Sequence, residues 1–305
     1  MLDPQAEALL QALAAANLPP LSQLSPEEAR RLEREVPLPP LPPGVAVVDR
    51  SVPGPAGDLR VRCYTPQAAR GPLPLLVYYH GGGFVLGSLE THGWLCAYLA
   101  LKAEAVVASV DYRLAPEAPF PAPLEDAYAA WLWLAHHAEE LGATPARLAI
   151  GGDSAGGNLA AGVSRWARDR KAPLPRLQVL FYPATDMVGD YPSKQEFAQG
   201  YGLTLEDMQW FGRHYLRRPE EAFSPEASPL RADLRGLPPT WLLTAEYDPL
   251  RDEGEAYLKA LVSSGVSAGG RRCLGLIHGF ASQAHLLERG REALDETAHL
   301  LQLLS

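Results

Sequence analysis

The sequence predicts an α/β fold with a mostly parallel central sheet, and two observations support that class. Apolar, strand-like segments alternate with helix-like segments along most of the 305 residues. This alternation is typical of a parallel sheet covered by helices on both faces. Hydrophobic residues make up 47% of the chain and charged residues 21%, a globular composition in a chain long enough to bury a large core.

The N-terminal part is predicted to form two short helices, at 4–17 and 26–35. Ser25 is the expected N-cap of the second helix and Pro26 its first residue, a combination that favours helix initiation. The proline-rich segment 36–44, "VPLPPLPPG", cannot continue a helix and is interpreted as a linker.

From Val45 onwards the pattern changes to strands. The segments "VAVVDR" (45–50) and "LRVRCYTP" (59–66) are expected to be strands joined by a turn at 53–58. Further strands are expected at 74–80, 105–112, 147–153, 177–183, 240–248 and 271–275. Helices are expected at 124–141, 157–170, 256–264 and 291–304.

The alternation lapses between the strands at 177–183 and 240–248. A stretch of about 50 residues without a core strand indicates an insertion that lies on the sheet. It contains a helix-like segment at 205–216, which follows the expected N-cap Thr204.

Charge and cysteine content indicate which partners and which cellular compartment are compatible with the chain. The net charge of −9 carries no basic run, which argues against a nucleic-acid partner. Asp3 and Glu7 stand where a signal peptide would be basic, and no apolar window is long enough for a membrane span. Cys63, Cys96 and Cys273 are odd in number and widely spaced, so we expect reduced thiols in a cytoplasmic protein.

Two segments match the pattern G-x-S-x-G, "GDSAGG" at 152–157 and "GVSAGG" at 265–270. The pattern alone decides nothing in a chain with 27 glycines. Ser154 follows a strand and precedes a helix, so a sharp turn would expose its hydroxyl beside a helix N-terminus that favours negative charge. Ser267 follows a helix and precedes a strand, which predicts an ordinary loop. Ser154 is therefore the candidate nucleophile.

A serine nucleophile needs a base and a carboxylate that orients the base. Among eight histidines, only His278 stands in a loop directly after a late strand. In the order Ser, acid, His, Asp248 at the end of the strand 240–248 is the favoured acid, with Asp186 as its rival. Asp252 is interpreted as first-turn helix charge. The histidines interpreted as bystanders in helix-like segments are His92, His136, His137, His214, His285 and His299.

A third element is the glycine run in "YYHGGGF", residues 78–84. Consecutive glycines after a core strand allow several backbone N–H groups to point at one oxygen. The segment therefore predicts an electrophilic site for a developing oxyanion.

These residues occur in motifs whose order resembles the bacterial carboxylesterase group of the hormone-sensitive lipase family of α/β hydrolases. The resemblance runs from about residue 45 onwards and rests on five motifs: "HGGGF", "DYRLAPEAPFPAPLEDAY", "GDSAGGNLA", "YDPLRDEG" and "HGF". It implies the α/β-hydrolase fold, with Ser154 as nucleophile, His278 as base and Asp248 as its orienter. It also implies an oxyanion hole formed by Gly82, Gly83 and Ala155, supported by His80, Gly81, Gly152 and Gly156.

The resemblance also implies a domain plan. Residues 1–44 and 187–225 would form a helical cap, over a catalytic domain composed of 45–186 and 226–305. No metal or organic cofactor is expected. The expected partner is a small ester, with no membrane span, and a homodimer is left open.

The predicted reaction is hydrolysis of short- to medium-chain acyl esters by a Ser-His-Asp acyl-enzyme mechanism. The chain length is predicted from aromatic residues of the cap segments that could close an acyl pocket, namely Phe197, Tyr201, Trp210 and Phe211. Two alternatives stay open: an amidase acting on arylamides or formamides with the same triad, and a non-catalytic receptor for small molecules.

Overall fold

The computed structural model describes residues 1–304 and contains one eight-stranded sheet in the order β1-β2-β4-β3-β5-β6-β7-β8. The strands are β1 (Val45–Gly54), β2 (Gly57–Pro66), β3 (Leu73–Tyr79), β4 (Val106–Val110), β5 (Ala143–Asp153), β6 (Leu177–Phe181), β7 (Thr240–Tyr247) and β8 (Ala268–Ile277). β2 pairs antiparallel with β1 and with β4, whereas the other neighbouring strands pair parallel. The mostly parallel sheet predicted from the sequence is confirmed.

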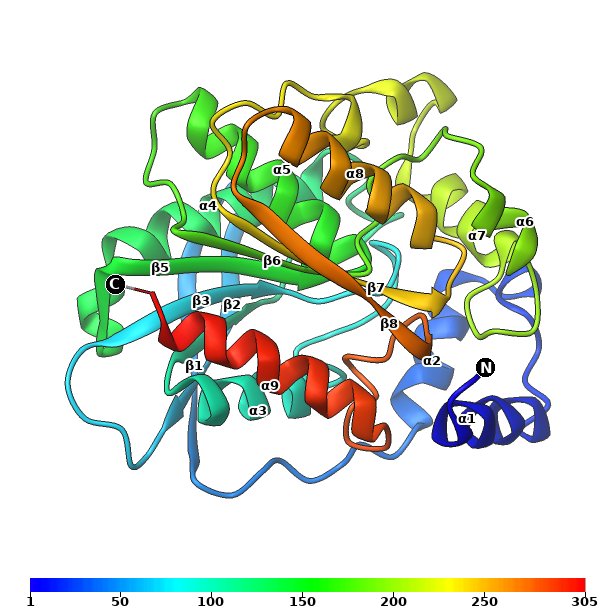
Figure 1. Ribbon diagram of the computed structural model, residues 1–305, viewed down its shortest axis with the longest axis horizontal. Coiled ribbons are helices and arrows are strands. Elements are labelled where there is room, and N and C mark those ends of the chain that lie inside the picture. Colours follow the sequence, from blue (N-terminus) through cyan, green and yellow to red (C-terminus); the bar gives the residue numbers. More distant parts are fainter. Residues whose placement is uncertain (305) are drawn as a thin grey trace.

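Helices cover both faces of the sheet (Figure 1). They are α1 (Pro4–Ala15), α2 (Pro26–Glu35), α3 (Gly93–Ala103), α4 (Ala122–His136), α5 (Ala155–Asp169), α6 (Pro192–Glu196), α7 (Leu205–Tyr215), α8 (Arg251–Ser263) and α9 (Glu288–Gln302). Short 3₁₀ helices are η1 (Leu21–Gln23), η2 (Ala138–Leu141), η3 (Pro219–Phe223) and η4 (Pro229–Arg231). One buried apolar cluster packs α4, α5 and α8 on one face, and a second packs α3 and α9 on the other.

The two predicted N-caps, Ser25 and Thr204, are confirmed. The Ser25 hydroxyl accepts the Glu28 N–H, and the Glu28 carboxylate accepts the Ser25 N–H, which completes a capping box at α2. Thr204 and Asp207 make the same pair of bonds at α7.

The element boundaries differ from the sequence prediction by up to five residues, and two segments differ more than that. Most of the predicted turn at 53–58 is strand, because the hairpin ladder continues to the pair Gly54 and Gly57 and only two residues remain between the strands. The predicted helix at 124–141 is interrupted at His137, after which the chain continues as η2.

The two segments predicted to form a cap lie together at one end of the sheet. α1 and α2 adjoin α6 and α7 near the ends of the strand arrows of β7 and β8 (Figure 1). The indole Nε1 of Trp210 in α7 donates a hydrogen bond of 3.1 Å to the carbonyl oxygen of Leu24, which precedes α2. Residues almost 190 positions apart are thereby joined over the carboxyl ends of the strands.

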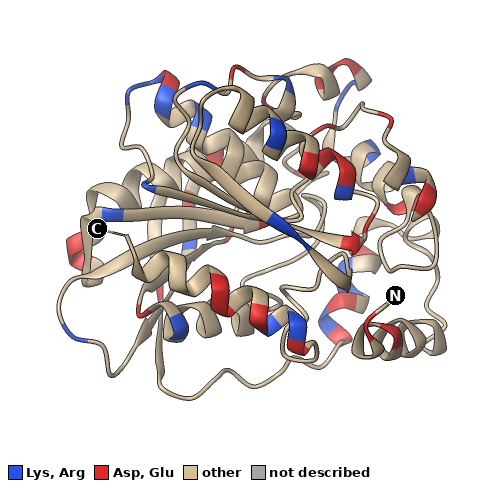
Figure 2. Cartoon of the chain, in the orientation of Figure 1, with Lys and Arg blue, Asp and Glu red and all other residues tan. Residues whose placement is uncertain are grey.

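Charged residues of both signs are interspersed on the helices around the sheet, which itself carries few of them (Figure 2). Within residues 1–304, no helix has the length and apolar character needed to cross a membrane. Cys63, Cys96 and Cys273 are buried free thiols.

Candidate active site

Ser154 occupies a strained turn between β5 and α5. Its φ of 54° and ψ of −118° are rare for a residue other than glycine, and they direct the chain sharply from strand into helix. A Cβ atom on Gly156 would lie 1.9 Å from the Tyr79 carbonyl oxygen, and one on Gly152 would lie 2.4 Å from the Gly156 backbone. The flanking glycines are therefore required by close backbone contacts, as the sequence pattern predicted.

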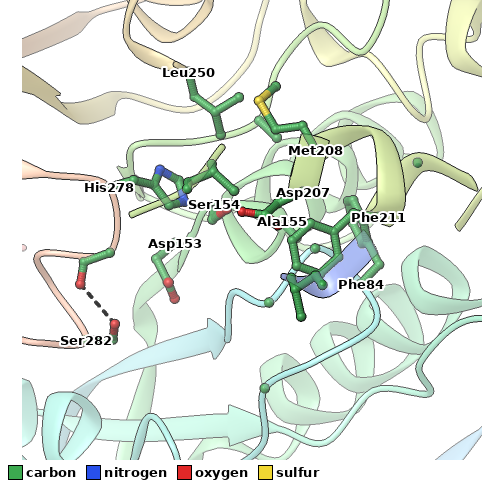
Figure 3. Close-up of a pocket in the computed structure, with 18 of the residues that line it drawn as sticks. Phe84, Asp153, Ser154, Ala155, Asp207, Met208, Phe211, Leu250, His278 and Ser282 are labelled. Atoms are coloured by element: carbon green, nitrogen blue, oxygen red, sulfur yellow. Dashed lines mark hydrogen bonds between the residues drawn. The ribbon is translucent and has the colours of Figure 1, made fainter. Parts of the chain in front are cut away.

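Three predicted catalytic side chains meet above this turn. The Ser154 hydroxyl lies 3.0 Å from Nε2 of His278, whose Nδ1 lies 2.8 Å from Oδ2 of Asp248. Asp248 is fully buried at the end of β7, and its other carboxylate oxygen accepts the Leu250 N–H at 2.8 Å. Figure 3 shows Ser154 and His278 side by side in the cavity. The geometry is that of a nucleophile, a base and an orienting carboxylate.

The rival acid Asp186 lies in a different environment. Its carboxylate forms an ion pair of 2.9 Å with Arg231 and accepts the Tyr191 hydroxyl at 3.0 Å. Burial raises the pKa of Asp186, but the hydrogen bonds from Arg231 and Tyr191 together lower it by more. The net pKa is therefore below the usual value. Asp186 is thus held as an anion by Arg231 and Tyr191, whereas Asp248 is the carboxylate that contacts His278.

The predicted oxyanion residues line the same cavity as Ser154. Gly82 and Gly83 have φ values of +114° and +60°, and Ala155 begins α5, where backbone N–H groups lack helical partners. A Cβ atom on Gly83 would lie 2.2 Å from the Phe211 ring, so glycine permits the close approach of α7. The structure therefore places all three residues with candidate N–H donors in the wall of the cavity that contains Ser154.

His80 supports this loop from the core. The ring is completely buried, stacks on Tyr112 with centroids 4.4 Å apart, and places Nδ1 2.7 Å from the Gly81 carbonyl oxygen. Burial, together with the nearby His92 charge, lowers the pKa of His80 to about 4. The imidazole is consequently neutral at pH 7 and contacts the Gly81 carbonyl oxygen, in keeping with an organising role.

Sequence reasoning missed a buried pair of Asp153 and His92 beside Ser154. Asp153 accepts hydrogen bonds from the Tyr78 hydroxyl at 2.9 Å and the Gly81 N–H at 3.0 Å, and lies 3.3 Å from Nε2 of His92. Burial lowers the pKa of His92, but the Asp153 charge and hydrogen bond raise it to a net value above normal. Burial raises the pKa of Asp153, but the His92 charge lowers it below normal. His92, interpreted as a bystander, is part of this pair.

The cavity above Ser154 has a volume of about 1030 Å³, and its walls come from the sheet edge and from both segments predicted to form a cap. Of the four cap aromatics named in the sequence analysis, Phe211 lines it (Figure 3). Trp210 donates its hydrogen bond to Leu24, which directly follows η1. Phe197 makes edge-to-face contacts with Tyr201 and Tyr247, and Tyr201 stacks on Tyr247. The expectation that all four close the pocket is wrong, because Trp210 packs against the N-terminal segment, and Phe197 and Tyr201 pack against Tyr247 of β7. Among residues 1–304, no group of three or more His, Cys, Asp or Glu side chains is arranged to hold a metal ion.

Comparison with known proteins places this geometry in a family. A family described by the alpha/beta hydrolase fold matches residues 76–282, which include every predicted catalytic residue. The chain belongs to the carboxylesterase group of the α/β hydrolases. This confirms both the resemblance to the hormone-sensitive lipase family and the predicted fold.

Several carboxylesterases are similar over much of the chain. "Carboxylic ester hydrolase LipN" of Mycobacterium tuberculosis is 49% identical over 243 residues, which cover 77% of this chain and 64% of that protein. "Ethyl acetate hydrolase" of Pseudomonas putida is 40% identical over 248 residues, which cover 80% of this chain and 78% of that protein. The solved hyperthermophilic esterase of Pyrobaculum calidifontis superposes with a TM-score of 0.91 at 44% identity, covering 99% and 98% of the two chains. The prediction of a carboxylic ester hydrolase is confirmed.

Proposed function

We propose that this protein hydrolyses short- to medium-chain acyl esters through a covalent intermediate on Ser154. The observation that carries the proposal is the continuous chain of contacts from Asp248 to His278 at 2.8 Å and from His278 to Ser154 at 3.0 Å. Both distances are within hydrogen-bond range, so the base can accept the serine proton without rearrangement.

The first half-reaction forms an acyl-enzyme. His278 accepts the Ser154 proton at Nε2 while the serine oxygen attacks the ester carbonyl carbon. Asp248 holds the opposite ring N–H and stabilises the imidazolium. The negative oxygen of the tetrahedral intermediate is bound by the N–H groups of Gly82, Gly83 and Ala155. When the intermediate collapses, the ester C–O bond breaks and the leaving alcohol takes the proton from His278.

The second half-reaction regenerates the serine. His278 takes a proton from water, the resulting hydroxide attacks the acyl-enzyme, and the same N–H groups bind the second oxyanion. Collapse returns the proton to Ser154 and releases the carboxylic acid. Every proton transfer therefore uses one imidazole.

The acyl-length preference is supported by an aromatic wall beside the oxyanion glycines. Phe84 and Tyr215 stack with centroids 3.7 Å apart, and both line the cavity together with Phe211. Each added methylene gains roughly 0.8 kcal/mol until such a wall is met, after which overpacking reverses the trend. We expect kcat/KM on p-nitrophenyl esters to peak at about C4 to C8 and to fall at C16. A continuous rise to C16, or activation at an oil–water interface, would contradict this.

Esters and amides are separated by one experiment. Purified protein is assayed on a p-nitrophenyl ester and on the matching anilide, with and without a serine-directed organophosphate. We expect inhibitor-sensitive turnover of the ester at a rate far above that of the anilide. Faster anilide turnover would favour the amidase, and stoichiometric binding without turnover of either compound would favour the receptor.

We also propose a cytoplasmic location, which is supported by three buried cysteines that are free thiols. Assembly as a homodimer is tested directly by size-exclusion chromatography with light scattering.

A further inference from the structure

The oxyanion loop, defined here as residues 80–87, is folded tightly on itself. The N–H groups of Val85 and Leu86 both donate to the Gly82 carbonyl oxygen, at 3.0 and 2.8 Å. A Cβ atom on Gly82 would lie 2.2 Å from the Leu86 carbonyl oxygen, and one on Gly87 would lie 2.3 Å from the Gly81 carbonyl oxygen. The two halves of the loop are therefore in direct backbone contact, and Gly87 cannot move without displacing Gly81 or Gly82.

The inner half of this loop is held by the catalytic domain. The Gly81 N–H donates to the carboxylate of Asp153, the residue that precedes the nucleophile. This bond fixes one side of the oxyanion glycines to the end of β5.

The outer half is held by helix α2 of the N-terminal segment. The Gly87 N–H donates to both carboxylate oxygens of Glu33, each at 3.1 Å. One helical turn earlier, Nε of Arg30 donates to the Val85 carbonyl oxygen at 2.8 Å. Residues three apart share a helix face, so α2 contacts the loop at two successive points.

Arg30 also connects α2 to the segment around Ala115 in the same chain. Its Nη2 donates to the Ala115 carbonyl oxygen at 2.7 Å, and its guanidinium pairs with Glu117 at 2.8 Å. The Ala115 N–H donates to the Phe84 carbonyl oxygen at 2.9 Å. Several groups therefore hold the Arg30 guanidinium in place. Among residues 1–304, the Glu33 carboxylate accepts hydrogen bonds from one donor, the Gly87 N–H.

We propose that Glu33 is a positioning residue for the oxyanion hole. Its carboxylate holds Gly87, and through the folded loop it fixes the N–H groups of Gly82 and Gly83 at the place where the negative oxygen develops. Glu33, Gly87, Gly82 and Ser154 line one cavity, and Phe84 lies in the same wall (Figure 3). This inference rests on the proposed ester hydrolysis and assigns to the N-terminal helix a part in transition-state stabilisation.

The test compares Glu33→Ala and Glu33→Gln with a control on the same helix, Glu35→Ala. Glu35 is 61% exposed and pairs weakly with Arg31 at 3.7 Å. Each protein is assayed on p-nitrophenyl butyrate, with active sites counted by titration and folding checked by thermal unfolding. Inhibition by an alkyl trifluoromethyl ketone is measured in parallel, because serine addition to it creates a stable oxyanion.

For Glu33→Ala we expect kcat about 10- to 100-fold lower with KM changed less than about threefold, since a misplaced donor weakens the transition state more than the bound ester. Its inhibition constant for the ketone should rise by a similar factor. Glu33→Gln keeps an oxygen acceptor and should recover most of the activity, and Glu35→Ala should match wild type.

The proposal is overturned if folded Glu33→Ala retains kcat and ketone affinity within about threefold of wild type, or if KM alone changes. Should that variant fail to fold, Glu33→Asp carries the test, because its shorter side chain keeps the charge but withdraws from Gly87. Unchanged kcat and ketone affinity in Glu33→Asp would also overturn the proposal. Wild type without esterase activity would refute the proposed function and this inference together, so the two failures are distinguishable.

Discussion

The two G-x-S-x-G segments of this chain have nearly the same letters and opposite surroundings. In 152–157, Ser154 has a positive φ, is followed by α5 and contacts His278. In 265–270, Ser267 is exposed at the start of β8, and its carbonyl oxygen accepts the Thr240 N–H as part of the strand ladder. The serine is the same residue in both, but only one is adjacent to a base.

The difference arises from what surrounds the glycine two positions after each serine and from the residue before the serine. A Cβ atom on Gly156 would collide with backbone, whereas one on Gly269 would meet only the Trp241 ring at 3.4 Å. Asp153 precedes Ser154 and holds the oxyanion loop, while Val266 precedes Ser267 and is packed in the core. A catalytic motif is therefore defined by the elements on either side of it, and the pentapeptide pattern alone is insufficient.

The largest expected effect breaks the comparison directly. Ser154→Ala should lower ester turnover by a factor of about 10⁴ or more, because no other hydroxyl replaces the nucleophile. Ser267→Ala should leave turnover nearly unchanged. Mass spectrometry of protein treated with an organophosphate should locate the adduct on Ser154; an adduct on Ser267 would reverse the assignment of the two segments.

The next effect concerns two aspartates that both follow strands. Asp248→Asn should lower kcat by roughly 10³- to 10⁴-fold with the fold retained, because the amide holds the His278 imidazole in the wrong tautomer. Asp186→Asn should change kcat by less than about tenfold, since that carboxylate binds Arg231 and Tyr191. Steady-state kinetics of both variants decides the matter, and the reverse order would make Asp186 the acid.

A third prediction compares the glycines that follow the two serines. Gly156→Ala should lower the free energy of unfolding by about 3 kcal/mol and reduce activity, because the new methyl group overlaps the Tyr79 carbonyl oxygen. Gly269→Ala should change it by less than about 0.5 kcal/mol. Denaturant titration of both variants provides the measurement, and equal losses would show that the elbow is not specially crowded.

The smallest effect uses pH to probe the residue before Ser154. His92 has a raised pKa, so its stabilising contribution is complete below about 6.5 and is lost as pH rises through the folded-state value. Asp153 has a lowered pKa, so its contribution is complete above about 3.9 and is lost as pH falls through the folded-state value. The pair therefore stabilises most between these limits.

His92→Gln should accordingly lower the free energy of unfolding by about 2 kcal/mol near pH 6 and by less at pH 9. Denaturant titrations of wild type and variant at both pH values give the difference. A loss that is independent of pH would mean that His92 contributes only packing, and the contrast between Asp153 and Val266 would then have no ionic component.

Sequence alone predicted that Ser154, Asp248 and His278 lie together, because each stands directly after a strand and the carboxyl ends of parallel strands meet at one edge. The helix N-caps also depend on residues close in sequence, and Ser25 and Thr204 cap their helices as predicted. Such features depend on a few neighbouring residues, which is why a pattern can predict them.

Contacts between distant segments had no such signal. Glu33 lies on a short, highly charged helix, where a carboxylate is ordinarily solvated, and its bond to Gly87 spans 54 positions. His92 lies in a segment that looks helical, and its contact with Asp153 spans 61. The inner packing of Trp210 likewise follows from how two cap segments meet. These roles are set by tertiary contacts, which periodicity and propensity do not encode.

The Ser154–His278 hydrogen bond joins residues 124 positions apart, and His278 follows the strand that forms one edge of the sheet. Bringing such distant residues together carries a large loop-closure cost, whereas helices form from local contacts on a microsecond timescale. Esterase activity should therefore return after the far-ultraviolet helix signal when the protein refolds from denaturant. Recovery of turnover would therefore measure the pairing of β8 with β7, and not the formation of the turn that carries Ser154.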